Sequence, residues 1–452
     1  MGSETYGLAQ DRDPSSTGPG REAVGGREPD LSAGVPALRI AVVGMSLGPT
    51  CGARDHALLL AEGLDREEVS CSLHWLDRRE QSMRRGGAEI RAWGQALGGE
   101  LARERPDAIL LHYSVFAFSH RGLPLFVAPV LAVLRRSGIP VVAVLHEYVY
   151  PWRHGGLRGK VWAITQRALL IDVMRSSAAV LLTTDFRAHW LESRRWLPWR
   201  PAAFAPVFSN LPPPVGGPSP VSPDLPSALP GSRPAPSHRP AALAEPVGHR
   251  AQPVLGLFGY SYQGAALSLV LDAIVLLSKG GVAPLLVLLG APGRRSPVAA
   301  TWLREARARG IEQALEFSDT LPAQALSNAL AACDLLLFAD AAGPSSRKGT
   351  LAASLASGRP VLAIDGPRRW LELVWGEAAS VVEPTAPALA DAICELLGDD
   401  AAREALGARG RAFAEERMGV ARTVEAVGGL LDGVVSVEPS LWAASRLAPV
   451  AR

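Results

Sequence analysis

The chain has 452 residues, of which 48% are hydrophobic and 20% are charged, and this composition is typical of a folded globular protein. The length accommodates two or three domains, and the formal net charge of +2 gives no general reason to expect nucleic-acid binding. The N-terminus lacks the apolar segment of a signal peptide, and the apolar run at residues 123–134 is too short to span a bilayer. We therefore expect a cytoplasmic protein.

The cysteines give no sign of a metal site or of a disulfide framework. The chain has four of them, far apart and without metal-ligand spacing: Cys51, Cys71, Cys333 and Cys394. We expect ordinary core thiols in a reducing compartment.

Two segments of low hydrophobicity divide the chain. Residues 1–37 are rich in Gly, Ser, Pro, Asp and Arg, and we expect a disordered leader. Residues 212–253 hold 13 of the 37 prolines, so neither a helix nor a central strand is expected there. We interpret 212–252 as a linker or insertion, which leaves two folded blocks at about 38–211 and 253–435.

Each block alternates short apolar runs with helical patterns, as parallel α/β units do. The predicted strands of the first block are 38–45, 69–76, 107–114, 140–147 and 178–184. Those of the second block are 253–260, 283–291, 315–319, 333–340, 359–365 and 379–384. The runs are continuous in Val, Leu and Ile rather than alternating, so both faces of each sheet should be covered. We predict two doubly wound α/β domains, with ligands bound at the carboxyl ends of the strands.

In the first block, glycines and a histidine follow predicted strands. Gly48 and Gly52 lie between the first strand and a helix expected from Ala53, where they permit close approach of a ligand to the backbone. The segment is not G-x-G-x-x-G, so a dinucleotide site is not expected. His146 and Glu147 end the fourth strand. A histidine there is commonly structural, held by a neighbouring carbonyl, and this alternative stays open beside a functional role.

In the second block, a cationic loop precedes a helix of small residues. The strand at 333–340 is followed by the predicted site residues, which are Ser345, Ser346, Arg347, Lys348, Gly349 and Thr350, while Gly259 ends the first strand of the block. An arginine fork and a lysine beside free helix amides favour a phosphate or diphosphate ligand. A solvated basic loop, or a site for a carboxylate, is the alternative.

With these pieces in place, the chain resembles a two-domain GT-B glycosyltransferase of family 4. The similar segments are the glycine loop and helix at 43–64, "RRSGIPVVAVLHE", "APVFSNLP", "LASGRPVLA" and the C-terminal residues 407–431. The resemblance implies two Rossmann-like domains facing across a cleft. The acceptor domain would be 38–211 and the nucleotide-sugar domain 253–415, followed by a helix at 416–435 that crosses back to the first domain and a tail at 436–452.

The resemblance also implies a reaction and assigns roles to individual residues. A sugar would pass from a nucleotide-diphosphate donor to an acceptor hydroxyl with retention of configuration and without metal or cofactor. His146 would contact the transferred sugar, and Glu147 would lie on the acceptor side. In the family, two paired glutamates hold the sugar hydroxyls and the nucleotide ribose. Ser345 and Ala353 stand in their places here, so these two contacts cannot be carried over. The family's usual arginine and lysine in the first loop of the donor domain are also missing, with Tyr260 and Gln263 in their places. We expect Arg347 and Lys348 to hold the diphosphate in place of that pair.

The acceptor is not specified by the sequence. Residues 186–204 interleave three tryptophans (Trp190, Trp196 and Trp199) with four arginines (Arg187, Arg194, Arg195 and Arg200), which suits either a peripheral membrane contact or an ordinary amphipathic surface. A glycan, a lipid carrier and a small molecule all stay open as acceptors. The alternatives to a transferase are another GT-B enzyme, such as a nucleotide-sugar epimerase, and a non-catalytic GT-B scaffold.

Overall fold

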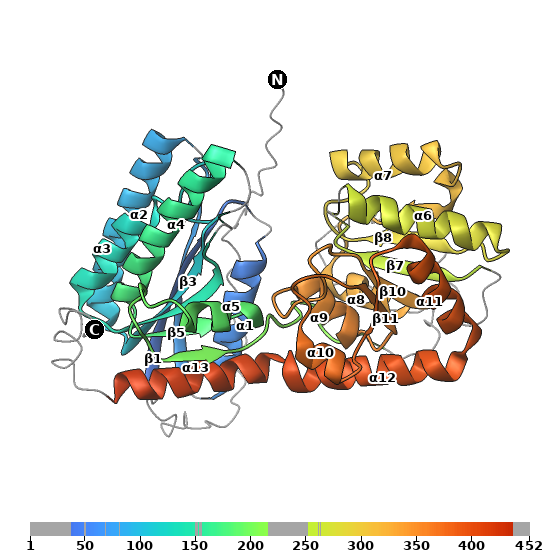
Figure 1. Ribbon diagram of the computed structural model, residues 1–452. Coiled ribbons are helices and arrows are strands. Elements are labelled where there is room, and N and C mark those ends of the chain that lie inside the picture. The colour runs from blue at the N-terminus through green and yellow to red at the C-terminus, as the bar shows by residue number, and fades with distance from the viewer. Residues whose placement is uncertain are drawn as a thin grey trace, which may run out of the picture.

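The computed structural model describes residues 38–48, 51–67, 69–80, 82–149, 152, 156–215, 252–260, 262 and 264–436. The predicted leader (1–37), most of the Pro-rich tract (212–252) and the predicted tail beyond Ser436 lie outside the described residues. The described part forms two α/β domains that lie side by side (Figure 1).

The first domain is built on a parallel sheet of six strands in the order β2-β1-β3-β4-β5-β6. The strands are β1 (Leu38–Ser46), β2 (Val69–Asp77), β3 (Ala108–Ser114), β4 (Val141–Glu147), β5 (Ala179–Leu182) and β6 (Ala202–Phe204). The helices are α1 (Gly52–Asp65), α2 (Met83–Glu104), α3 (Val127–Ser137), α4 (Gly156–Ser176) and α5 (Asp185–Glu192). Helices α2, α3 and α4 cover one face of the sheet and α1 covers the other.

The second domain is built on another parallel sheet of six strands, in the order β12-β11-β10-β7-β8-β9. The strands are β7 (Val254–Phe258), β8 (Leu285–Leu289), β9 (Leu315–Phe317), β10 (Leu335–Phe338), β11 (Val361–Ile364) and β12 (Ser380–Val382). The helices are α6 (Ala265–Lys279), α7 (Pro297–Ala308), η2 (Glu312–Ala314), α8 (Ala323–Ala331), α9 (Gly349–Ala356), α10 (Leu371–Trp375) and α11 (Ala386–Gly398). Helices α6, α7 and α11 pack on one face, and α8, α9 and α10 pack on the other.

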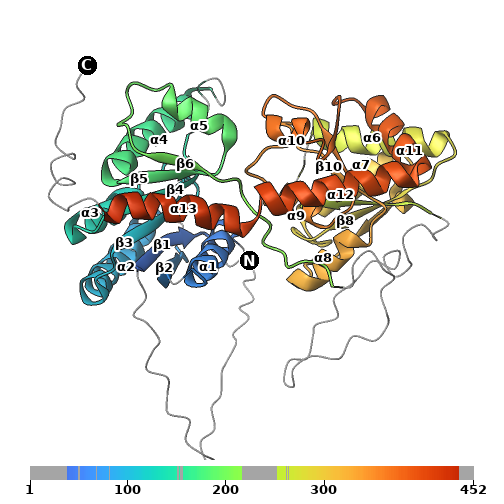
Figure 2. The same cartoon turned by 90° about the horizontal axis from the view of Figure 1, so that it is seen from below.

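The C-terminal helices α12 (Asp400–Arg417) and α13 (Val420–Val435) join the two domains a second time. Helix α12 packs on the second domain, and α13 then runs beneath the first domain (Figures 1 and 2). Val427, Leu431 and Val434 of α13 are buried in the same apolar cluster as Ile40 and Val42 of β1. The helix therefore completes the first domain, although it belongs to the end of the chain.

Continuous apolar runs explain why these strands form the centres of the sheets. Residues 40–43 of β1 are at most 1% exposed, which is expected when helices cover both faces of a strand. The two parallel sheets confirm the predicted fold class. The sixth strand of the first sheet, β6, was not predicted, because its three residues, Ala-Ala-Phe after Pro201, are too few to form a recognisable strand pattern.

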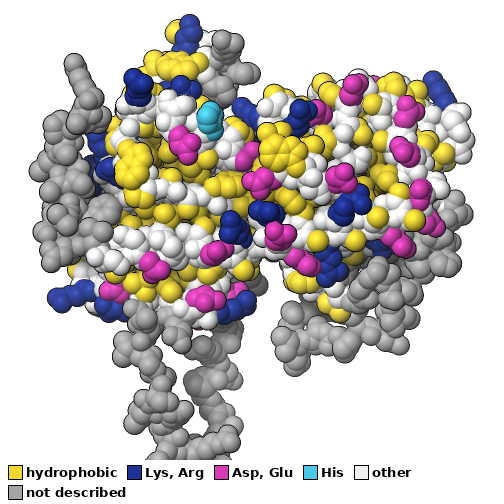
Figure 3. Space-filling model, turned by 60° about the horizontal axis from the view of Figure 1, so that its bottom comes forward, with side chains coloured by type: hydrophobic (Ala, Val, Ile, Leu, Met, Phe, Trp, Pro, Cys, Tyr) yellow, Lys and Arg dark blue, Asp and Glu magenta, His cyan; other side chains and the backbone are white. Residues whose placement is uncertain are grey.

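Both sheets contain a point at which the strand order reverses, and ligands of open α/β sheets bind at such points. It lies between β1 and β3 in the first sheet and between β7 and β10 in the second. The face that carries α12 and α13 shows basic and acidic side chains interspersed rather than gathered by sign (Figure 3). The described residues of that face therefore form no large patch of a single charge sign.

Candidate functional site

The reversal point of the second sheet brings together most of the residues predicted for the donor. Gly259 follows β7 with a φ of +68°, and a Cβ added to it would lie 2.8 Å from Thr350 Cγ2. Glycine is therefore required by both the backbone conformation and the contact. Gly349 begins α9 and faces the first domain, since a Cβ on it would lie 3.7 Å from Val207 Cγ1.

The two serines of the loop are buried, and Ser346 forms hydrogen bonds across the contact between the domains. Ser345 is 3% exposed and Ser346 is fully buried. The Ser346 hydroxyl lies 2.9 Å from Asp185 Oδ1, to which it donates, and it accepts from the Asp185 amide at 3.0 Å. The Ser346 carbonyl accepts from the amide of Val207 at 2.8 Å. Ser346 thus binds the first domain rather than pointing a free hydroxyl at a ligand.

Each cation of the loop already has a carboxylate partner. Arg347 Nη1 is hydrogen-bonded to Glu147 Oε1 at the end of β4, so this ion pair crosses between the domains. Lys348 Nζ lies 2.6 Å from Asp340 Oδ2 within the second domain. Burial, and secondarily the charge of Arg368, lowers the pKa of Arg347. The loop is therefore not a freely solvated basic loop, and an arriving anion must compete with two carboxylates.

Sequence reasoning placed Glu147 on the acceptor side and did not identify Asp340 as a site residue. The structure puts the Glu147 side chain against the cationic loop of the second domain, through its ion pair with Arg347. Asp340 follows β10 by two residues and has a side chain that is 17% exposed. Its position directly after a buried strand was the signal that could have marked it.

His146 lies in a group of three histidines from three elements of the first domain. His56 comes from α1, His112 from β3 and His146 from β4. His112 Nδ1 and His146 Nε2 are 3.1 Å apart, and the rings of His56 and His146 meet edge to face with centroids 5.0 Å apart. Burial lowers the pKa of His146 to about 4, and it lowers the pKa of both partners as well. All three imidazoles are therefore neutral near pH 7.

Sequence reasoning identified only one member of this group. His112 stands near the carboxyl end of a predicted strand, as His146 does, and that shared position was a usable signal. His56 lies on the helix that follows the glycine loop, where nothing in the local pattern separates it from a packing residue.

The predicted glycine loop of the first domain borders open space. A Cβ added to Gly48 or to Gly52 would meet no atom within 4 Å in the described part of the chain. Beside this loop, the ends of β1 and β2 border a cavity of about 520 Å³. Its polar lining includes Arg78, Ser82 and Arg121. Arg78 is 5% exposed and already donates to the carbonyls of Ala117 and Ser119, so the lining suits a polar ligand without showing a preference for an anion.

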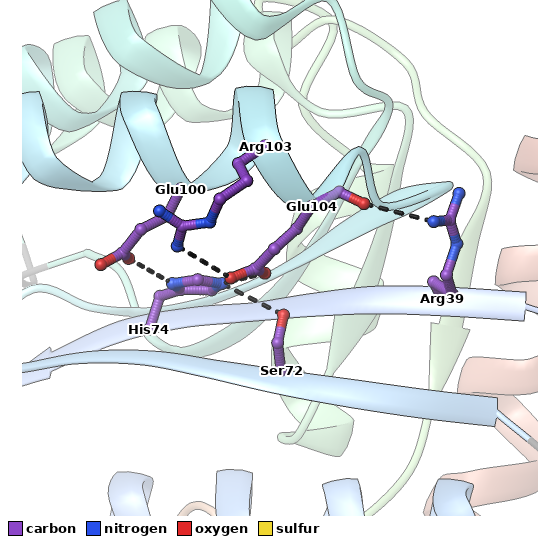
Figure 4. Close-up of polar contacts among 6 residues, drawn as sticks. All are labelled: Arg39, Ser72, His74, Glu100, Arg103 and Glu104. Atoms are coloured by element: carbon purple, nitrogen blue, oxygen red, sulfur yellow. Dashed lines mark hydrogen bonds and ion pairs between the residues drawn. The ribbon is translucent and has the colours of Figure 1, made fainter.

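A fourth histidine of this domain shows how a buried imidazole is normally satisfied. His74 of β2 is 7% exposed and lies between two glutamates of α2 (Figure 4). Its Nδ1 is 2.8 Å from Glu100 Oε2, and its Nε2 is 3.1 Å both from Glu104 Oε2 and from Ser72 Oγ. With both nitrogens engaged in bonds that join a strand to a helix, His74 is a structural residue.

The stretch with tryptophans and arginines is only partly a surface. Trp196 is 41% exposed and Trp199 is 80% exposed. Arg187, by contrast, is 9% exposed and stacks on Tyr148 at 4.8 Å, so it is wrong to count it among surface cations. Within the described residues, no helix combines the length and hydropathy needed to cross a membrane.

Comparison with known proteins identifies the fold. No protein-family model and no curated protein matches the chain. Among solved structures, it is similar to sucrose-phosphate synthase from Thermosynechococcus elongatus (TM-score 0.63, 14% identity, covering 90% of this chain and 100% of that one). It is also similar to HepE from Anabaena in complex with UDP and glucose, with a TM-score of 0.59 and 14% identity, covering 88% of this chain and 100% of that one. A third similar structure is UDP-GlcNAc 2-epimerase from Neisseria meningitidis bound to UDP-GlcNAc. Its TM-score is 0.52 and its identity 10%, and the match covers 87% of this chain and 99% of that one. The chain has the GT-B fold, as its sequence predicts, while the assignment to family 4 stays a prediction.

Proposed function

We propose that the chain is a glycosyltransferase that moves a sugar from a nucleoside-diphosphate donor to an acceptor hydroxyl. The observation that carries this proposal is the convergence of Gly259, Arg347, Lys348 and the N-terminus of α9 at the reversal point of the second sheet. That is where an open α/β sheet binds a nucleotide. Support also comes from HepE, a protein of the same fold whose complex contains UDP and glucose.

The donor diphosphate would take the place of the two carboxylates that now face the cations. Arg347 offers two parallel donors to phosphate oxygens, and Lys348 adds a point charge at the N-cap of α9. As the nucleoside diphosphate departs, negative charge develops on the bridging oxygen. Fixed cations and helix amides aimed at that oxygen lower the barrier without a metal ion at this site. Retention of configuration is the stereochemical course that we propose.

Exchange of partners would release Glu147 when the donor binds. Glu147 follows His146 directly at the end of β4, so the freed carboxylate would lie at the same edge of the sheet as the imidazole. His146 would contact the transferred sugar, and Glu147 would then serve the acceptor. The ion pair between Arg347 and Glu147 would therefore form when the donor site is empty and break when the donor binds.

The acceptor would bind to the first domain. The cavity near the ends of β1 and β2 is lined by Ser82 and Arg121 among others, which suits a glycan, a phosphorylated lipid carrier or another polar molecule. Trp196 and Trp199 are the exposed aromatic side chains that would contact a membrane if the acceptor is a lipid. A peripheral location on the inner face of the membrane is part of this proposal, as is a cytoplasmic site of action.

Two further functions each have one observation in their favour. The similarity to UDP-GlcNAc 2-epimerase supports an epimerase, which would convert a nucleotide sugar into its epimer without an acceptor. The pairing of Arg347 with Glu147 and of Lys348 with Asp340 supports a scaffold, because cations that are already neutralised need no ligand.

Thermal-shift binding tests the proposal directly. Wild-type protein, an Arg347→Ala/Lys348→Ala variant and an Arg409→Ala/Arg411→Ala control, which removes two half-exposed cations of α12, would be titrated with UDP, GDP, ADP and TDP and their sugars. We expect one nucleotide to stabilise the wild type and the control but not the loop variant.

The release of nucleotide and the fate of the sugar then separate the three functions. A transferase releases nucleoside diphosphate slowly with water and faster with an acceptor. An epimerase changes the sugar within the donor, which NMR detects. A folded wild type that is stabilised by none of the nucleotides would favour the scaffold and contradict the proposal.

A further inference from the structure

The three histidines of the first domain are arranged as a set of converging ligands. One ring nitrogen from each of His56, His112 and His146 lies within 4.8 Å of the other two, and the nearest pair is 3.1 Å apart. The three residues come from a helix and two adjacent strands, so the fold rather than a local loop holds them together. In tetrahedral coordination at about 2.0–2.1 Å, ligand nitrogens are about 3.4 Å apart, so rotations of the rings that move nitrogens by about an ångström complete the geometry.

Two of the three histidines are buried without the partners that a buried imidazole requires. His56 is 3% exposed, and neither of its ring nitrogens has a hydrogen-bond partner among the described residues. His112 is 2% exposed, and its Nε2 also lacks a partner within that part of the chain. A buried polar group without a partner destabilises the folded state, and His74 avoids this penalty by bonding through both nitrogens. A species bound between the rings would give one nitrogen of each ring a partner and so reduce this penalty.

The ligand atoms of the group decide which species fits. Each histidine offers one ring nitrogen to the set, and both nitrogens of His56 and Nε2 of His112 have no hydrogen-bond partner among the described residues. The converging set consists of imidazoles alone, and no carboxylate of the described residues belongs to it. Hard cations such as Mg²⁺ and Ca²⁺ prefer oxygen ligands, whereas neutral imidazole suits Zn²⁺ and its neighbours among the transition metals.

We propose that His56, His112 and His146 bind one divalent transition-metal ion of the Zn²⁺ type, through one ring nitrogen each. Three protein ligands leave a fourth position open for water or another small ligand. The ion would tie α1 to β3 and β4, and because it binds only the folded chain it would stabilise that state. The site belongs to the first domain and needs no donor, so it stands independently of the proposed transferase activity.

The site has one direct consequence for that activity. His146 is shared between the metal set and the contact proposed for the transferred sugar. A metal-bound His146 is fixed in orientation and has one nitrogen fewer to offer. The metal ion and the donor would therefore influence each other's affinity, while the binding of each can be measured in the absence of the other.

Co²⁺ is the spectroscopic probe for the test, because its visible absorption reports coordination by protein nitrogens. The full-length protein would be treated with a chelator, dialysed and titrated with Co²⁺ and then with Zn²⁺. We expect one equivalent to bind and Zn²⁺ to displace Co²⁺. His56→Asn/His112→Asn should bind about 100-fold more weakly or not at all, while His189→Asn, which removes an exposed histidine of α5, should bind as the wild type does.

A measurement on the wild type keeps the result independent of whether the double variant folds. X-ray absorption of the zinc-loaded protein should show three imidazole nitrogens at about 2.0 Å. Sulfur ligands at about 2.3 Å would instead assign the metal to cysteines and overturn the proposal. Failure of the wild type to bind one equivalent, or equal binding by a folded double variant, would overturn it as well and would leave water as the species between the rings.

Discussion

Replacing Glu147 with glutamine should strengthen nucleoside-diphosphate binding, although it removes a bond that is present in the structure. The side chains of Arg347 and Glu147 are 25% and 28% exposed, so their ion pair lies between the surface and the interior. A pair in such a position contributes about 1 kcal/mol. A diphosphate that binds Arg347 must first break this pair, and Glu147→Gln removes that competition. We expect the dissociation constant to fall by about 5-fold, which corresponds to about 1 kcal/mol.

Isothermal titration calorimetry with the nucleoside diphosphate that stabilises the wild type most would measure this change. The matched control is Glu312→Gln, which breaks the exposed ion pair between Glu312 and Arg307 in the same domain and should leave the affinity unchanged. The effect should also vanish in an Arg347→Ala background, because no pair is then left to break. Weaker or unchanged binding by Glu147→Gln would refute the idea that Glu147 competes with the ligand. An equal gain in the Arg347→Ala background would show that the gain does not pass through the ion pair.

Three other substitutions test the packing and the titration of the site. Gly259→Ala should lower the free energy of unfolding by about 1–3 kcal/mol, because its positive φ and close contact exclude a side chain, whereas Gly52→Ala should have little effect in the same urea titration. Since burial lowers the pKa of His146 to about 4, the folded state binds its proton only at lower pH than the unfolded chain does. Stability should therefore be fully present above about pH 6.5 and fall towards pH 4, less steeply in His146→Gln; equal slopes would contradict this. Ser346→Ala should cost about 1–2 kcal/mol by removing the bond to Asp185 across the domains, and an unchanged urea midpoint would count against that contact.

The sequence allowed the sheets to be predicted because a strand covered on both faces must be apolar throughout. β1 and β10 are such strands, and the residues at their carboxyl ends could be examined one by one as candidates for ligand binding. β6 could not be found in this way, since a strand of three residues at the edge of a sheet carries too few apolar positions to form a pattern.

Only the parts of the candidate site that lie within one continuous segment of the chain could be predicted from the sequence. The loop from Ser345 to Thr350 could be identified because its cations directly precede a helix. The pairing of Arg347 with Glu147 could not, because the two residues are 200 positions apart and meet only after both domains have folded and docked. The same holds for the histidine group, whose members belong to a helix and two strands and converge only through the order of the sheet.

Helix α13 has a consequence for how this protein is made. The first domain needs Val427 and Leu431 to cover the face of its sheet, yet a ribosome synthesises these residues after the whole of the second domain. During translation, the part of that face that α13 covers stays exposed beside α1 while the second domain is synthesised and folds. A fragment that ends before α12 should consequently expose apolar surface and aggregate. Since the polypeptide also passes between the domains twice, any motion that separates them must bend two connections at once, which favours a hinge over free rotation.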